Sequence, residues 1–120
     1  MLRLKFIIMK KIEAIVRRER FEEVKQALAD LGVGAITASE VCGGNLGQPL
    51  QLTYRCQQYS VDVLPKIKIE VVVAAREADT VIQAVIEAAH TGEGDDGQVF
   101  VSEVTAAFRI CNYQRDEAAV

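Results

Sequence analysis

The chain has 120 residues, of which 50% are hydrophobic and 6% aromatic, and its formal net charge is −3. This length accommodates one domain with a buried core, and the apolar content excludes an intrinsically disordered chain. The acidic balance argues against nucleic-acid binding, and the sequence has no run of roughly 20 apolar residues of the kind that a membrane-spanning helix needs.

A strand, a helix and a second strand are predicted in the first third of the chain. Apolar and polar residues alternate over residues 11–16, which is typical of a strand with one buried face. Apolar residues then recur at helical spacing over 21–31, and Gly32 is a natural stop for that helix. Residues 35–41 have the composition of a second strand.

Residues 42–59 have no sustained hydrophobic period. Glycine and proline interrupt a polar stretch that ends in YRCQQY, whose second tyrosine is Tyr59. A loop of this length in a compact domain is usually functional or disordered. The position of this segment directly before a strongly apolar strand therefore indicates a functional loop.

Regular patterns return in the second half of the chain. Residues 61–73 predict a strand interrupted by a proline, and residues 81–89 predict a helix. The glycine-rich turn TGEGDDGQ, at 91–98, leads to the strand VFVSEV, at 99–104. A last short strand is expected at 108–110.

The predicted order is β-α-β, a long loop, and β-α-β. This is the ferredoxin-like split βαβ plan, an α+β fold in which two helices cover one face of a four-stranded antiparallel sheet. We expect a single domain at 9–120, with 1–8 as an N-terminal extension if Met9 is the true start. Strands such as IKIEVVV carry apolar residues on both faces, which predicts an oligomer interface with closed symmetry on the uncovered face. A central strand with some exposed valines is the alternative.

Candidate catalytic and metal-binding residues are few. No Ser or Cys stands in a nucleophile-elbow context, so we expect a protein without enzymatic activity. Cys42, Cys56 and Cys111 form an odd, widely spaced set, which favours reduced thiols and a cytoplasmic location. The alternative is a metal-binding or structural trimer that uses Cys42, Cys56 or His90, although a histidine at the end of a helix also suits the helix dipole.

The segment 91–98 allows two interpretations. Clusters of glycine and aspartate are typical of tight turns. Closely spaced glycines also let backbone N–H groups converge on an anion. Gln98 stands where a lysine would strengthen the second interpretation.

Six blocks of sequence, in order, make the chain recognisable. They are MKKIEAIVRRERFEEVKQALADLGV, TASEV, YRCQQY, VDVLPKIKIEVVV, TGEGDDGQVFV and DEAAV, and they run from Met9 to Val120. Together they resemble the PII nitrogen-regulatory signal proteins. The resemblance implies a homotrimer that binds adenine nucleotides in the clefts between its subunits. It also implies that 42–59 is the family's T-loop, which contacts a target such as a membrane transporter or metabolic enzyme, and that 91–98 is the phosphate-cradling B-loop.

The resemblance further assigns individual residues. Tyr59 falls where the family carries its uridylylated tyrosine, although YRCQQY departs from the family motif. The implied nucleotide site comprises Thr37, Gly43, Gly44, Lys66, Glu70, Asp95, Asp96, Gly97, Gln98 and Arg109.

Three departures from the family pattern affect the expected ligands. Gly47 replaces a glutamine that helps to hold magnesium and 2-oxoglutarate, Gln98 replaces a phosphate-binding lysine, and Cys111 replaces an arginine. Losing two phosphate partners costs about 3–6 kcal/mol, on the order of 10² to 10⁴ in affinity. We therefore expect AMP or ADP to be favoured over ATP, a weak 2-oxoglutarate response, and a small anion such as bicarbonate as a second ligand.

Overall fold

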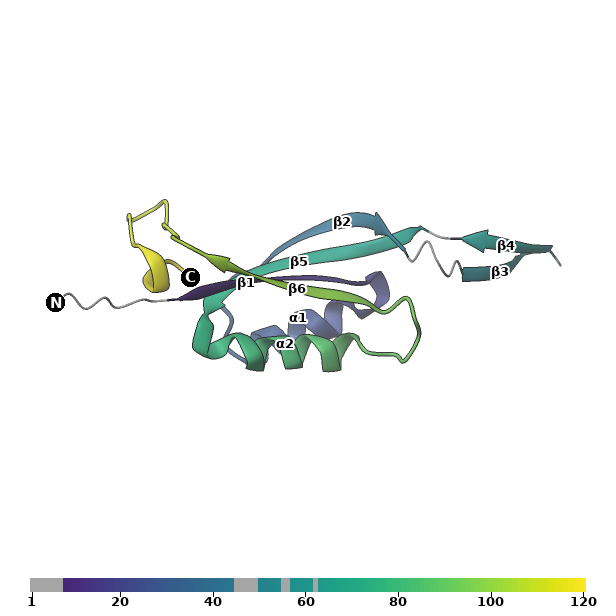
Figure 1. The fold of residues 1–120 in the computed structure, drawn as a ribbon, viewed down its shortest axis with the longest axis horizontal. Coiled ribbons are helices and arrows are strands. Elements are labelled where there is room, and N and C mark those ends of the chain that lie inside the picture. The colour runs from purple at the N-terminus through teal and green to yellow at the C-terminus, as the bar shows by residue number, and fades with distance from the viewer. Residues whose placement is uncertain (1–7, 45–49, 55–56, 62) are drawn as a thin grey trace.

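The computed structural model describes residues 8–44, 50–54, 57–61 and 63–120. Within them, a four-stranded antiparallel sheet with strand order β2-β5-β1-β6 is covered on one face by two helices (Figure 1). The elements of this domain are β1 (Met9–Arg17), the 3-10 turn η1 (Arg18–Arg20), α1 (Phe21–Asp30), β2 (Thr37–Gly43), β5 (Leu64–Ala74), α2 (Ala75–Ala89), β6 (Gly97–Val104) and the 3-10 turn η2 (Asp116–Ala119). The predicted ferredoxin-like fold is confirmed.

The core lies between the sheet and the helices because alternate residues of the central strands face the helices. Ile12 lies opposite Val71 and Ala14 lies opposite Ile69 across β1 and β5, and all of these side chains are buried. The helices add buried residues at spacings of three and four, namely Val24, Leu28, Ala78, Val81, Val85 and Ala89. In the part of the chain that the structure describes, neither helix has the length and hydrophobicity needed to cross a bilayer.

The end of α1 follows its sequence prediction. Gly32 has a φ of 83°, a left-handed conformation that glycine adopts without strain. Its amide donates to the carbonyl of Ala29, and the amide of Val33 donates to the carbonyl of Leu28. These two hydrogen bonds form a Schellman cap that ends the helix and turns the chain toward β2.

The segment 42–59 contains more regular structure than its sequence predicts. β2 continues to Gly43, and Leu50–Tyr54 (β3) pairs with Gln57–Val61 (β4) as an antiparallel hairpin that projects beyond the end of the sheet (Figure 1). The prediction of an aperiodic loop was wrong there. LQLTY alternates apolar and polar residues, but over only five positions, and it directly follows a stretch that contains glycine and proline, so the short strand pattern was passed over.

The strand expected at 108–110 is also absent from the structure. Phe108 forms one isolated bridge with Arg115, and the intervening chain is a tight turn. Tyr113 has a φ of 61°, and its amide donates to the carbonyl of Arg109. The turn reverses the chain before a second strand residue can pair.

The sheet face opposite the helices carries both charge and apolar area. Lys11 pairs with Glu70 at 2.9 Å, and Lys68 pairs with Glu13 at 3.3 Å. Phe100 of β6 lies directly opposite Glu13 and is 50% exposed. Part of the uncovered apolar surface expected from the sequence is therefore present, beside a charged centre.

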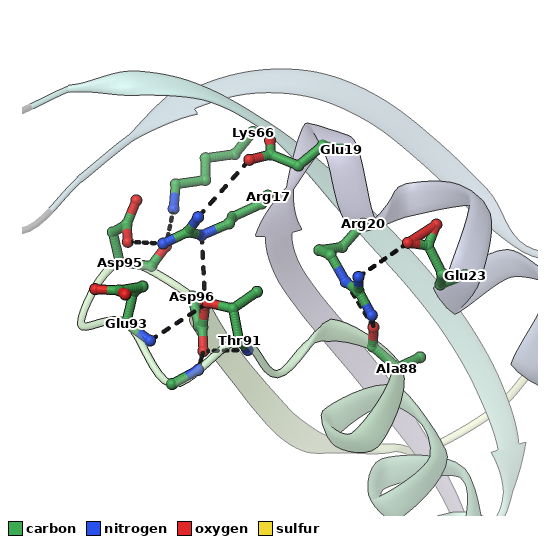
Figure 2. A network of polar contacts seen from close by, with 11 residues as sticks. Arg17, Glu19, Arg20, Glu23, Lys66, Ala88, Thr91, Glu93, Asp95 and Asp96 are labelled. Carbon is green, nitrogen blue, oxygen red and sulfur yellow. Dashed lines mark hydrogen bonds and ion pairs between the residues drawn. The ribbon is translucent and has the colours of Figure 1, made fainter.

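Arg20 ties the start of α1 to the end of α2. Its guanidinium donates two hydrogen bonds to the carbonyl of Ala88, at 3.0 and 2.7 Å (Figure 2). Replacing Arg20 with alanine should lower the free energy of unfolding by about 1–2 kcal/mol, because a helix-end carbonyl loses a charged donor. Urea unfolding at fixed protein concentration measures this loss.

Arg18 provides the matched control in the same turn. Its guanidinium pairs with Glu40 while both side chains are largely exposed. Arg18→Ala should therefore change the free energy of unfolding by less than about 1 kcal/mol. Equal losses in the two variants would contradict the assigned role of Arg20.

Candidate anion-binding site

Two cationic side chains meet at one end of the sheet. Arg17, the last residue of β1, lies directly opposite Lys66 of β5. Lys66 is 3% exposed and the Arg17 side chain is 19% exposed. Like charges directly opposite each other destabilise a sheet, so this basic pair needs anionic partners.

The loop between α2 and β6 supplies those partners. Figure 2 shows Arg17 and Lys66 directed at this loop, where a terminal nitrogen of Arg17 donates to the Asp95 carboxylate and the Lys66 ammonium donates to the main-chain carbonyl of Asp95. The Nε of Arg17 also lies 3.4 Å from a carboxylate oxygen of Asp96. The 91–96 loop and the basic pair therefore form one connected cluster.

The loop is held in shape by the carboxylate of Asp96. This carboxylate accepts hydrogen bonds from the amides of Thr91 and Gly92, at 2.8 and 2.9 Å, and from the Thr91 hydroxyl. The first two amides of the segment 91–98 therefore converge on an anion, and that anion is the carboxylate of Asp96. Burial raises the pKa of Asp96, but these hydrogen bonds and the nearby charge of Arg17 outweigh that effect and lower the pKa to about 2.

The lowered pKa of Asp96 predicts a loss of stability in acid. Because the folded-state pKa of about 2 lies below the ordinary value of 3.8, the ionised carboxylate stabilises the fold above about pH 4. That contribution, roughly 1 kcal/mol after solvent screening, should be lost progressively as the pH falls from about 4 through about 2. The difference in thermal midpoint between Asp96→Ala and the unchanged protein should be largest at pH 6 and should narrow steadily as the pH is lowered to 2.5.

The exposed Asp79 gives a control for this pH dependence. Asp79→Asn removes one carboxylate from the surface of α2, and it should leave the acid-dependent loss of stability in place. A constant gap between Asp96→Ala and the unchanged protein from pH 6 to pH 2.5 would contradict the assignment.

Several glycines expected in the site lie around this cluster. Gly97, the first residue of β6, lies opposite Val16 and has a φ of 117°. A Cβ at Gly43 would lie 3.9 Å from the Cγ of Lys66, which places this end of β2 beside the lysine stem. Gly44 follows it and is exposed, and Gln98 lies opposite Ile15 of β1.

The other predicted site residues lie elsewhere. Thr37 of β2 is directly opposite Glu70 of β5, and both line a cleft of about 970 Å³ together with Arg109. The hydrogen bond that Lys11 donates to Glu70 lowers the pKa of this carboxyl. Four residues of extended strand, roughly 13 Å, separate Glu70 from Lys66. Thr37, Glu70 and Arg109, here called the cleft group, therefore form a second assembly distinct from the basic pair.

The structure also bears on the candidate modification site and the candidate metal ligands. Tyr59 lies within β4, where its backbone is opposite Leu52. Cys42 and Cys111 are exposed free cysteines, and Cys56 lies outside the described residues. Over residues 8–44, 50–54, 57–61 and 63–120, no group of three His, Cys, Asp or Glu side chains could hold a metal ion.

Sequence reasoning missed Arg17. The residue lies in RRER, where several arginines follow the strand pattern and none stands out. Its position in the strand could have identified it. Residues two apart in a strand share a face, so Arg17 follows Glu13 and Ile15 on the face opposite the helices.

Comparison with known proteins matches this chain and its fold to one family. The model of the family "Nitrogen regulatory protein P-II" matches residues 9–114. The chain is 40% identical over 114 residues to nitrogen regulatory protein P-II 2 of Methanothermobacter thermautotrophicus, covering 95% of this chain and 99% of the relative. It is 39% identical over 112 residues to nitrogen regulatory protein P-II 1 of Escherichia coli K12, covering 93% of this chain and 100% of the relative.

Solved structures agree with these relatives. The structure of Arabidopsis thaliana PII bound to citrate superposes with a TM-score of 0.76 at 32% identity, covering 95% of this chain and 94% of the other. The structure of B. subtilis GlnK gives a TM-score of 0.77 at 30% identity, covering 94% and 99%. The fold and these matches define a small regulatory protein and not an enzyme. The chain belongs to the P-II family of nitrogen regulatory proteins.

Proposed function

We propose that this protein is a cytoplasmic signal-transduction regulator that binds an adenine nucleotide and transmits its occupancy to a target protein. The basic pair and the 91–96 loop hold the phosphates, and the cleft group holds the remainder of the nucleotide. The segment 42–59 is the arm that contacts the target, a membrane transporter or a metabolic enzyme of nitrogen or carbon metabolism.

One observation carries the proposal. The residues implied for nucleotide binding fall into two separate groups. Lys66 lies opposite Arg17, where β1 ends, whereas Arg109 lies in the segment after β6, whose last residue pairs with the first residue of β1. In this proposal each group by itself is half of a nucleotide site. A homotrimer joins the basic pair of one chain to the cleft group of its neighbour, which places the nucleotide between subunits.

The ligand preference follows from the charges in the cluster. The basic pair already contacts Asp95 and Asp96, and Gln98 adds no charge. AMP or ADP is therefore favoured over ATP, whose longer phosphate chain needs more cationic partners. Gly47, in place of the family glutamine, weakens the response to 2-oxoglutarate, and a small anion such as bicarbonate serves as the second ligand. The citrate of the Arabidopsis thaliana relative supports anion binding as a property of this fold.

Calorimetric titration with AMP, ADP and magnesium-ATP tests the proposal. We expect one AMP or ADP per chain with micromolar affinity, an ATP affinity no higher than that of ADP, and no effect of 2-oxoglutarate on ATP binding. Sub-micromolar ATP binding that is cooperative with 2-oxoglutarate would overturn the ligand preference. Failure of all three nucleotides to bind would overturn the function itself.

Tyr59 is the proposed modification site on the arm. Tyr59 lies in β4 of the projecting hairpin, and uridylylation there would add negative charge to the surface that meets the target. Mass spectrometry of protein from nitrogen-starved cells should show a uridylyl group on Tyr59. Unmodified Tyr59 in those cells would remove it from the signalling mechanism.

A further inference from the structure

The loop that would receive the phosphates already contacts both members of the basic pair. Asp95 contributes twice, because its carboxylate accepts from Arg17 and its main-chain carbonyl accepts from Lys66. The Asp95 side chain is only 12% exposed. A ligand phosphate that approaches Arg17 at the same nitrogen must first displace this carboxylate.

We propose that Asp95 is a specificity-determining residue whose carboxylate is an internal competitor for the ligand phosphate at Arg17. This inference rests on the proposed function of the same site. In the protein without ligand, the Asp95 carboxylate occupies the position at Arg17 that a ligand phosphate would take. Ligand binding exchanges it for a phosphate, which carries more negative charge and more acceptor oxygens.

The loop is built so that Asp95 can leave without unfolding its neighbours. The hydrogen bonds that shape the loop run from Thr91 and Gly92 to Asp96, and none of them uses the Asp95 side chain. Lys66 contacts the Asp95 carbonyl, which is independent of the side-chain rotamer. Release of the Asp95 carboxylate therefore breaks its ion pair with Arg17 and leaves the Asp96 contacts intact.

The expected effect of this competition is a reduced apparent affinity. A site that is competent only when Asp95 has swung away binds with its intrinsic affinity multiplied by the competent fraction. One charge-assisted hydrogen bond in a partly buried site corresponds to about a tenfold reduction. The protein then responds only to higher concentrations of its phosphorylated ligand.

The test is a double-mutant cycle between Asp95 and Arg17, read by titration with ADP and with inorganic pyrophosphate. Asp95→Asn keeps the shape and the carbonyl but removes the charge, and it should tighten both ligands about tenfold. In an Arg17→Gln background the same change should tighten them less than about threefold, because the contested cation is gone. Asp79→Asn, the matched change of net charge on exposed α2, should leave both affinities within about twofold.

Each result separates the competition from the proposed function. If the protein without substitutions binds ADP and Asp95→Asn binds it no more tightly, the competition is overturned and the proposed function stands. Tighter pyrophosphate binding with no ADP binding by any variant supports the competition and overturns the function. If Asp95→Asn raises ligand affinity equally with Arg17 and in the Arg17→Gln background, the effect is a general one of charge, and the competition is overturned. The competition is also overturned if Asp95→Asn binds neither ADP nor pyrophosphate. If the thermal midpoint of Asp95→Asn falls well below that of the unchanged protein, Asp95→Ser is titrated in its place, with the same results deciding.

Discussion

Replacing Gly97 with alanine should destabilise the protein by at least about 3 kcal/mol, the largest effect expected of any single substitution here. Gly97 has a φ of 117°, and an added Cβ would overlap the main-chain carbonyl of Ile15. Neither the strain nor the overlap can be relieved by a side-chain rotation, because both involve backbone. The first residue of β6 must then move away from β1, and the 91–96 loop must move with it. Urea unfolding at fixed protein concentration measures the loss.

Two other glycines separate the causes of that loss. Gly92 has a φ of 92° but open space around its Cβ position, so Gly92→Ala should cost about 1–2 kcal/mol from backbone strain alone. Gly34 has open space and no positive φ, so Gly34→Ala should change stability by less than about 1 kcal/mol. A Gly97→Ala protein as stable as Gly34→Ala would show that the close approach of β6 to β1 is misassigned.

Replacing Lys66 with methionine should separate binding from stability. Lys66 is buried opposite Arg17, and its ammonium donates to the main-chain carbonyl of Asp95. Removing the charge while keeping the apolar stem should leave the thermal midpoint unchanged or raise it, since a buried cation beside another cation is replaced by an apolar group. The affinity for ADP should fall about 100-fold, because the phosphates lose a desolvated cationic partner. Calorimetry and thermal unfolding of one preparation measure both quantities.

Lys68→Met is the matched control for Lys66→Met. Lys68 lies two residues further along β5 on the same face, and it pairs with Glu13 at a partly exposed position. Its replacement should leave ADP affinity within about threefold and cost less than about 1 kcal/mol. Similar losses of affinity in the two variants would point to general electrostatic attraction and would remove Lys66 from the site.

The fold could be predicted because the elements that form the core carry a period that matches burial. Residues 11–16 alternate because β1 has one face on the core, and residues 21–31 follow a helical period because α1 buries one stripe. The hairpin formed by β3 and β4 was missed because the alternation in LQLTY extends over only five residues and adjoins a stretch with glycine and proline. The strand expected at 108–110 does not form because a local turn from Arg109 to Tyr113 competes with strand pairing there.

The site could be predicted only in part. Lys66 and Asp96 were expected from the resemblance, and the structure places them in one cluster. Arg17 was not expected, because its role depends on lying opposite Lys66 across two strands that are far apart in the sequence. The ion pair between Arg17 and Asp95 likewise joins residues 78 positions apart. Such contacts follow from sheet register, which a local pattern of residue types does not contain.

Native mass spectrometry of the protein with ADP tests the central claim most directly. The account predicts a trimer that takes up as many as three ADP molecules, and a Lys66→Met protein that remains trimeric but loses them. A monomer that carries no nucleotide at any ADP concentration would contradict it.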